Sequence, residues 1–440
     1  MKEITAKILF ILIDLLIISF SIYFADSIRS NFADLFGAPH TASLSNYSAL
    51  LPLYILPILL FAYEGIYTYR YDFWHESRLI FKGIIFSALL VFAYLAMTKS
   101  IGVYSRSVIG LSFLIMAIIL PLSKNFTKKL LYNLGLWRKR AEIYGDDPFL
   151  MDEIYGNPYL GYIRPKEGEE PSTVFVNSKN SDVATLKSVI SSEIQNRSEV
   201  IFIPLIDDYD LTHSHIYELS NTRTNLIVFQ NRLKSRYRLL LKRITDLLLS
   251  VTIFPFLLLP MAYIAYRIRR EEPKSPTLFK QERLGRDGDL FICYKFRTMY
   301  EDGDSLLREH LKEHPEERDY YRQYHKYRDD PRITPIGKML RRTSLDELPQ
   351  IFNVFKQEMS FIGPRPYMPD EESQAGDALH NILAVRPGIT GLWQVSGRSD
   401  IDFNSRVDLD LWYIRNWNLW MDLVILIKTI KTVFLKEGAK

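Results

Sequence analysis

Asp346 and Glu347 are adjacent carboxylates in the segment LRRTSLDELPQIFNVF, at the expected start of a helix. Two arginines and two hydroxyl side chains directly precede them. A helix N-terminus favours anions, and arginine binds phosphate through paired hydrogen bonds. This combination of groups is suited to chemistry on a phosphate.

The same residues also match a structural motif. Ser344 followed by Glu347 has the spacing of a capping box, in which both side chains bond to the backbone of the first helical turn. Acidic residues in a first turn also complement the helix dipole without any catalysis. The segment alone therefore leaves a catalytic pair and a capping box open.

Basic residues beside glycine and proline recur in four segments, at 281–299, 329–350, 359–366 and 386–398. Glycine allows backbone N–H groups to approach a ligand, and so many rigid basic loops together predict a di-anionic ligand. The candidates for phosphate or nucleotide contacts are Lys295, Arg297, Arg341, Arg342, Arg365 and Arg398. No GxxxxGK[ST] phosphate loop is present in the sequence, so ATP hydrolysis of that type is not expected.

Three roles are open to a carboxylate among these cations. It can hold Mg²⁺, which takes oxygen ligands and usually bridges substrate phosphates. It can act as a base, or it can attack phosphorus directly, as aspartate does in some phosphoryl transfers. Residue spacing does not choose among them.

The composition limits the class of protein. A length of 440 residues favours two or three domains. The net charge of +4 is small and no zinc-finger spacing or basic arm is present, so no nucleic-acid partner is expected. One cysteine, Cys293, excludes an intrachain disulfide and a multi-cysteine metal site. Hydrophobic content of 48% beside 24% charged residues indicates separate membrane and water-soluble parts.

Residues 1–140 are predicted to form four transmembrane helices. A bilayer needs about 20 apolar residues, and four runs approach this length: 8–25, 49–67, 79–98 and 101–122. Basic residues gather before the first run, between the second and third, and after the fourth. The positive-inside rule therefore places the N-terminus and everything after residue 123 on the cytoplasmic side.

Residues 141–231 are predicted to form a small Rossmann-like α/β domain. Short β-branched runs at 173–177, 199–205 and 224–230 alternate with polar helical stretches, which favours βα units and a parallel sheet. The first turn, IYGDDPF, lacks the glycine triplet of a dinucleotide site. We therefore expect a regulatory or structural domain without a bound nucleotide.

A fifth apolar stretch, 244–266, has basic residues on both flanks. A spanning helix would put one of these basic clusters outside, against the positive-inside tendency. Pro255 and Pro260 each remove an intrahelical hydrogen bond, which favours a re-entrant helix that enters one leaflet and returns. The alternative is an ordinary kinked spanning helix, which would carry 271–440 to the other side.

The C-terminal stretch 409–435 is rich in aromatic residues, among them Trp412, Tyr413, Trp417 and Trp420. Aromatic side chains with basic neighbours are typical of the lipid headgroup level. A buried core helix is the alternative.

Segment 237–440 resembles the bacterial sugar transferase family, the monotopic polyprenol-phosphate phosphoglycosyl transferases. The motifs that carry the resemblance are, in order, KRITD, QERLGRDG, YKFRTM, DPRITPIGKMLRRTSLDELPQIFNVFK, MSFIGPRP and RPGITGLWQVSGR. The preceding apolar runs and α/β segment resemble the long members of the family. The resemblance thus implies an α-rich membrane protein whose mostly helical catalytic domain, 232–440, is built on a re-entrant helix. One departure is Leu259-Pro260, where family members often have Ser-Pro.

The resemblance also implies a reaction. A UDP-hexose, with galactose or glucose favoured, donates hexose-1-phosphate to undecaprenyl phosphate, giving undecaprenyl-diphospho-hexose and UMP in the first membrane step of surface polysaccharide synthesis. Asp346 is then the nucleophile that forms a covalent phosphosugar and a Mg²⁺ ligand, and Glu347 is its acid/base or orienting partner. The phosphate or nucleotide contacts are Arg341, Arg365, Lys295, Arg297 and Arg398.

The expected partners are the UDP-hexose, undecaprenyl phosphate and the lipid bilayer of a bacterial inner membrane, with the catalytic domain on the cytoplasmic face. A homodimer is a further hypothesis. Two other functions stay open on the sequence: a transferase that moves only the sugar and releases UDP, and a non-catalytic membrane scaffold of polysaccharide assembly.

Overall fold

The computed structural model of the chain divides into two compact units, Met1–Ile206 and Asp207–Lys440. Each unit is described by itself. The structure describes residues 2–32, 44–100, 103–145, 148–166, 168–178, 183–197, 199–204, 215–219, 224–228, 236–314, 317, 330–396 and 402–435.

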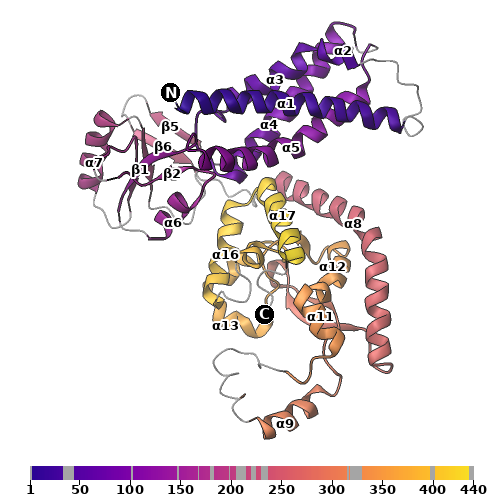
Figure 1. Cartoon of the computed structure of the whole chain (residues 1–440). Coiled ribbons are helices and arrows are strands. Elements are labelled where there is room, and N and C mark those ends of the chain that lie inside the picture. The colour runs from indigo at the N-terminus through magenta and orange to yellow at the C-terminus, as the bar shows by residue number, and fades with distance from the viewer. Residues whose placement is uncertain are drawn as a thin grey trace. The chain divides into compact units, whose positions relative to one another are not determined.

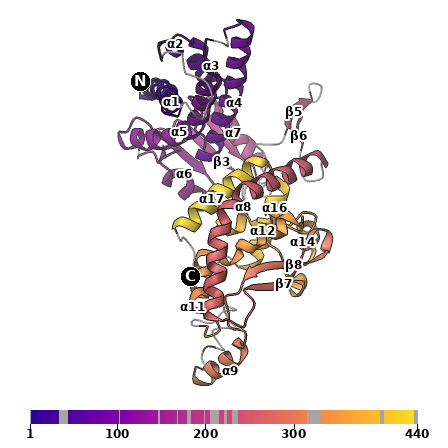
Figure 2. The same ribbon diagram turned by 90° about the vertical axis from the view of Figure 1, so that its right-hand side faces the viewer.

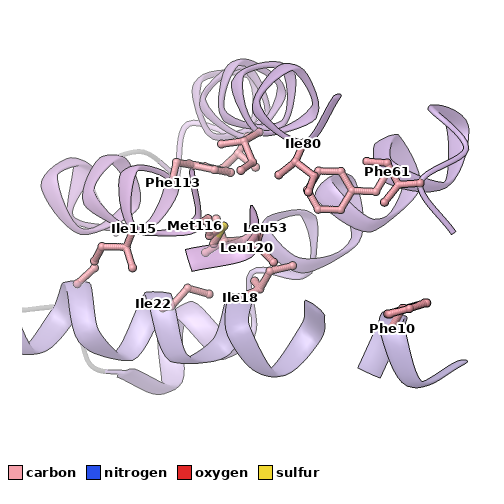
Figure 3. Packing of buried hydrophobic residues seen from close by; sticks show 14 of the residues in the cluster. Phe10, Ile18, Ile22, Leu53, Phe61, Ile80, Phe113, Ile115, Met116 and Leu120 are labelled. Carbon is pink, nitrogen blue, oxygen red and sulfur yellow. The ribbon is translucent and has the colours of Figure 1, made fainter. Parts of the chain in front are cut away.

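The first unit begins with a helical bundle (Figure 1). Its helices are α1 (Lys2–Asn31), α2 (Leu44–Ser48), α3 (Leu51–Tyr63), α4 (Phe73–Met97) and α5 (Arg106–Asn133). Helix α1 packs against α5, and α4 packs against both α3 and α5. Figure 3 shows apolar side chains from these helices gathered in one cluster, including Ile18, Leu53, Ile80 and Met116. The bundle therefore has its own core.

Helices α1, α4 and α5 are long and apolar enough to cross a membrane, which confirms three predicted apolar runs as membrane-length helices. Their outward faces carry exposed large apolar side chains such as Leu16, Leu89 and Leu114, as lipid contact requires. The run 49–67 was predicted to span as well, but α3 has 13 residues, a length of about 20 Å. It is followed by a turn with Gly65 at φ +76°. Helix α3 is therefore shorter than the predicted span.

Two ion pairs lie fully inside the bundle. Lys124 Nζ is 2.7 Å from Asp14 Oδ2, and the Tyr67 hydroxyl donates to the same oxygen at 2.7 Å. Lys128 likewise pairs with Glu76. All four charged side chains are at most 2% exposed. Since an unpaired charge in an apolar interior is costly, each pair holds two helices in one register.

The α/β part of the first unit contains the predicted parallel sheet, in the order β2-β1-β3-β4. Its strands are β1 (Lys139–Tyr144), β2 (Tyr162–Ile163), β3 (Thr173–Asn177) and β4 (Glu199–Ile203), with helices α6 (Pro148–Gly156) and α7 (Val183–Asn196). The predicted strand at 224–230 lies elsewhere. It forms β6 (Thr224–Val228), which pairs antiparallel with β5 (His215–Leu219) in the second unit.

Polar side chains of the bundle contact residues of the α/β part. Arg70 donates to Leu160 O at 2.7 Å and lies 3.9 Å from the centre of the Trp137 ring. The Tyr159 hydroxyl donates to Glu76 Oε2 at 2.9 Å, so the Glu76 ion pair belongs to both parts. The bundle and the sheet of the first unit are thus joined by buried polar contacts.

In the second unit, β5 and β6 are followed by α8 (Arg236–Glu271), a continuous helix that contains Pro255 and Pro260. It is also long and apolar enough to cross a membrane. Figures 1 and 2 both show α8 changing direction along its length, as internal prolines commonly cause. Exposed apolar side chains such as Leu248, Phe256 and Leu259 line its surface.

The rest of the second unit is mostly short helices around two small sheets. Strands β7 (Leu278–Leu284) and β8 (Leu290–Phe296) pair antiparallel, and β9 (Ser360–Ile362) pairs parallel with β10 (Gly388–Thr390). The helices are η4 (Arg286–Gly288), α9 (Gly303–Glu313), α11 (Pro335–Thr343), η5 (Leu345–Gln350), α12 (Ile351–Phe355), η6 (Pro369–Glu371), α13 (Glu372–Ala375), α14 (Asp377–Ile382), α15 (Leu392–Val395), α16 (Phe403–Asn416) and α17 (Leu419–Leu435).

A buried polar network holds the start of α8 to the end of the chain. Lys242 Nζ is 2.8 Å from Asp422 Oδ2 of α17, and the hydroxyl of Tyr413 and the indole N–H of Trp417 also donate to this carboxylate. Asp246 accepts from the Ser360 hydroxyl at 2.5 Å. Tyr413 and Trp417 are 1% and 2% exposed. Their predicted place at the lipid headgroup level was therefore wrong, because both side chains satisfy a buried carboxylate.

Candidate active site

The acidic pair lies just after α11. Thr334 caps this helix, since its side chain accepts a hydrogen bond from Gly337 N at 2.9 Å. The helix ends at Ser344, which adopts the left-handed conformation with φ 56°, a region that side chains other than glycine rarely enter. The chain then starts the 3₁₀ helix η5, whose first turn carries Asp346 and Glu347. The sharp turn at Ser344 thus sets the direction of both carboxylates.

The capping box, which the sequence left open as an alternative, does not form. The Ser344 side chain makes no capping hydrogen bond, because its left-handed backbone ends one helix and begins another. The Glu347 carboxylate does not turn back toward the backbone either. Its Oε1 is 2.7 Å from Lys295 Nζ of β8. The acidic pair is therefore used for a long-range contact and not for capping.

The position of α11 is fixed by its close approach to the end of β8. A side chain at Gly337 would collide with the carbonyl oxygen of Thr298, and Thr334 N donates to the same oxygen at 3.0 Å. Arg341 Nε donates to the Thr298 hydroxyl at 2.9 Å. The motifs YKFRTM and DPRITPIGKMLRR are thus two halves of one contact, which holds Arg341 beside Asp346.

A pocket of about 220 Å³ opens beside the acidic pair. It is lined by Arg283, Lys295, Glu347, Gln350, Arg365, Pro366, Gly388, Ile389, Trp393 and Gln394. Three of these residues are cations and one is an acid. The structure therefore brings together the predicted Lys295, Glu347 and Arg365, as expected for a site that binds an anion.

Arg365 enters the pocket from the motif GPRP. Gly363 N donates to Thr390 O at 2.9 Å, and Gly388 N donates to Pro364 O at 2.8 Å. A side chain on Gly363 or Gly388 would collide with the opposite backbone. The Arg365 guanidinium donates to Glu371 at 3.0 Å and lies 5.7 Å from the centre of the Trp393 ring. The glycines of two motifs are thus required for close backbone packing under the pocket.

The surroundings of Asp346 shift its pKa upward. Burial and the neighbouring Glu347 charge raise the pKa of Asp346 to about 6, against the opposing effects of Lys295 and Arg341. Glu347 in turn raises the pKa of Lys295, although burial acts in the other direction. Among the described residues no side chain makes a hydrogen bond or ion pair to the Asp346 carboxylate. This carboxylate is therefore available to a ligand.

Arg297, Arg341 and Arg342 do not line the pocket. Arg297 donates to Pro276 O at 2.9 Å and so holds a turn. Arg342 is exposed at the end of α11. Arg398 lies outside the described residues. Arg341 does not line the pocket, and its interaction with the site is the electrostatic one with Asp346.

The sequence prediction named three of the ten pocket residues and missed seven, among them Arg283, Gln350, Trp393 and Gln394. Arg283 lies within the quoted segment 281–299 and has the basic character that marked the other candidates. Its guanidinium donates to Pro366 O at 2.9 Å, directly beside Arg365. The sequence did not mark Gln350, Trp393 and Gln394 as candidates, because an uncharged residue in a motif can equally lie in the core or in a pocket.

The described residues contain no group of three or more His, Cys, Asp or Glu side chains able to enclose a metal ion. Mg²⁺ does not require such a cage, since it binds through one or two carboxylates together with substrate phosphates and water. The Asp346 carboxylate, which has no side-chain partner among the described residues, fits this mode of binding.

Fold and site together define a membrane protein with a cationic pocket around an acidic pair. The family model for bacterial sugar transferases matches residues 237–436. An undecaprenyl-phosphate galactose phosphotransferase of Salmonella typhimurium LT2 is 33% identical over 403 residues, covering 85% of this chain and 84% of that protein. The chain therefore belongs to the bacterial sugar transferase family.

Two further relatives differ in how much of the chain they match. The exopolysaccharide production protein ExoY of Sinorhizobium fredii is 41% identical over 202 residues, which cover 45% of this chain and 87% of that protein. A UDP-glucose:undecaprenyl-phosphate glucose-1-phosphate transferase of Klebsiella pneumoniae is 28% identical over 297 residues, 65% of this chain and 60% of that protein.

Proposed function

We propose that this chain transfers hexose-1-phosphate from a UDP-hexose to undecaprenyl phosphate and releases UMP. The names of the relatives support this reaction for either galactose or glucose. The observation that carries the proposal is the pocket in which Arg283, Lys295 and Arg365 surround Glu347, next to Asp346. Its charge suits a diphosphate at the membrane surface.

The donor diphosphate would lie among the three cations. Arg365 and Arg283 approach one another at Pro366, and their planar guanidinium groups suit paired hydrogen bonds to phosphate oxygens. Lys295 is held toward the acidic pair by Glu347. These fixed cations would stabilise the charge that develops on the leaving UMP.

Asp346 is our candidate nucleophile. One carboxylate oxygen would attack the phosphorus that bears the sugar, the bond from this phosphorus to the UMP oxygen would break, and UMP would leave with the bonding electron pair. The product is an aspartyl-phosphosugar. A pKa of about 6 keeps Asp346 ionised near neutral pH and makes it more basic than an ordinary aspartate.

In the second step, an oxygen of undecaprenyl phosphate would attack the same phosphorus and return the electron pair to Asp346. The lipid product is undecaprenyl-diphospho-hexose. We assign Glu347 the role of orienting partner, because its ion pair with Lys295 fixes a cation beside the reacting phosphorus. Such a two-step transfer predicts ping-pong kinetics.

We propose Mg²⁺ as the cofactor, bound through Asp346 and the substrate phosphates. When bound, Mg²⁺ would neutralise phosphate charge and favour the departure of UMP. Arg341 stays beside Asp346 and would limit the build-up of negative charge there.

We further propose that α8 is re-entrant and that the catalytic unit lies on the cytoplasmic face of the bacterial inner membrane. The bend of α8, its two prolines and its basic flanks support this topology. We propose three functional domains, 1–140, 141–231 and 232–440, with a regulatory or structural role for the second, whose range includes the boundary between the two compact units at Ile206. A cysteine introduced near residue 430 and probed with an impermeant reagent in intact cells tests the topology, because labelling would favour a spanning α8.

The reaction is tested by incubating the purified chain with radiolabelled UDP-galactose or UDP-glucose, undecaprenyl phosphate and Mg²⁺. UMP as the nucleotide product supports phosphosugar transfer. UDP would indicate transfer of the sugar alone, and no turnover with any UDP-sugar would favour a non-catalytic scaffold.

A further inference from the structure

Asp410 of α16 is a fully buried carboxylate, 0% exposed, that lies beneath the GPRP loop. Its Oδ2 accepts hydrogen bonds from Arg365 N and from the Tyr367 hydroxyl, both at 3.1 Å. Its other oxygen is buried and has no hydrogen-bond partner among the described residues. Burial raises the pKa of Asp410 to about 7, against the lowering effect of the two hydrogen bonds and the Arg365 charge.

The Asp410 carboxylate is unfavourable for the stability of the fold, because a buried acid with one unsatisfied oxygen costs desolvation free energy. The contacts that Asp410 does make are both to the segment that delivers Arg365 to the pocket. This position suggests a role in the site.

Asp410 is one of three hydrogen-bond partners that hold the backbone of the GPRP loop around Arg365. Pro364 O and Pro366 O are held by Gly388 N and Arg283, on either side of Arg365. The backbone N–H of Arg365 itself is held by Asp410. Rotation of this peptide would move the guanidinium away from Glu371, which holds it at 3.0 Å.

We propose that Asp410 is a positioning residue, which sets the backbone of Arg365 and thereby the guanidinium that binds the donor diphosphate. The inference rests on the proposed function for the identity of the donor. Asp410 does not line the pocket, so it acts through Arg365 and not on the substrate.

The test is a double-mutant cycle in which the dissociation constant for UDP is measured by calorimetry on the full chain in nanodiscs. Asp410→Leu removes both hydrogen bonds and keeps the volume, so we expect UDP to bind about tenfold more weakly. Asp410→Asn retains an acceptor oxygen and should stay within about threefold of the unmodified chain.

The same change is made in an Arg365→Ala background. If Asp410 acts through Arg365, Asp410→Leu then alters UDP binding by less than about twofold, because coupled residues are not additive. An equal loss in both backgrounds would show a general structural role and overturn the inference. So would UDP binding by Asp410→Leu that matches the unmodified chain.

Tyr367→Phe provides a second variant in case Asp410→Leu does not fold. It removes one hydrogen bond to Asp410 without leaving a large cavity, and we expect UDP to bind about threefold more weakly, again only when Arg365 is present. An unchanged UDP affinity, or the same loss without Arg365, would count against the inference. The proposed function is judged separately, by UMP release from the unmodified chain.

Discussion

The helical bundle of the first unit and the pocket of the second unit use buried charge in opposite ways. In the first, Asp14 is matched by Lys124 and Glu76 by Lys128, each pair enclosed by protein. In the second, the pocket gathers Arg283, Lys295 and Arg365 around a single lining acid, Glu347. In the bundle each charge has one enclosed partner, whereas the pocket is lined by three cations and one acid and lies beside Asp346, whose carboxylate has no side-chain partner among the described residues.

This difference implies separate roles for the two sets of charged residues, one in stability and one in ligand binding. A closed pair holds helices together, and its loss is a loss of stability. An incomplete cluster is unfavourable for folding until a ligand completes it, which is typical of active sites. Substitutions in the buried pairs of the bundle should therefore change stability, and substitutions in the pocket should change activity.

The largest expected effect is on activity. Asp346→Asn should lower UMP release by at least about 10³-fold, because an amide cannot form the phosphosugar ester. The melting temperature at pH 7.5 should not fall, because the variant removes a buried charge. UMP release and thermal unfolding are measured together.

Asp304→Asn, at an exposed aspartate of α9, is the matched control and should keep full activity. Near-normal UMP release by Asp346→Asn would make the acidic pair a structural feature and remove the contrast between the units.

The next effect is on stability. Lys124→Met leaves Asp14 buried without its cation and should cost about 3–5 kcal/mol of unfolding free energy. Combining it with Asp14→Leu should recover most of this loss. The measurement is thermal unfolding in detergent, and UMP release per folded molecule should not change.

Lys82→Met serves as the control, since the Lys82–Glu64 pair has a half-exposed lysine and should contribute less than about 1 kcal/mol. An equal loss from Lys82→Met and Lys124→Met would show that burial does not distinguish these pairs.

A smaller effect is expected from pH. The nucleophile must be ionised, and the pKa of Asp346 is about 6. The single-turnover rate of UMP release should therefore fall about tenfold per pH unit below 6. For stability the sign is reversed. A raised carboxyl pKa favours the protonated folded state, so the destabilisation by Asp346 is absent below about pH 4 and complete above about pH 6.

Asp346→Asn should therefore raise the melting temperature at pH 8 more than at pH 4. A single-turnover rate that is flat between pH 5 and pH 7 would contradict the assignment of this pKa to the nucleophile.

The smallest effect concerns the helix that positions the pair. Thr334→Ala removes the cap of α11 and should cost about 1 kcal/mol of unfolding free energy, with a modest loss of UMP release. Thr334→Ser keeps the hydroxyl and should retain stability. Thermal unfolding of the three proteins distinguishes the cap from the loss of a methyl group.

The sequence predicted what depends on local composition. The lengths of the apolar runs identified α1, α4, α5 and α8. Basic residues in segments that contain glycine and proline identified Lys295 and Arg365. It did not predict what depends on distant partners. Asp14 and Lys124 are 110 residues apart, so their pairing is not visible in any window of sequence. Asp410 resembles the polar face of a helix until the GPRP loop is placed over it.

The turn at Ser344 shows a second kind of limit. Its sequence matches a capping box at the start of a helix. In the structure, Ser344 instead adopts the left-handed conformation between α11 and η5, and Glu347 pairs with Lys295. The functional pair is thus held by a backbone that local rules disfavour, as is common at active sites.

The ion pair between Lys242 and Asp422 has a consequence for biosynthesis. Its partners are 180 residues apart, and a ribosome adds roughly 5–20 residues per second. Lys242 is therefore synthesised roughly 10–40 seconds before Asp422. During that interval Lys242 lacks its buried partner, so the start of α8 cannot yet be held by α17.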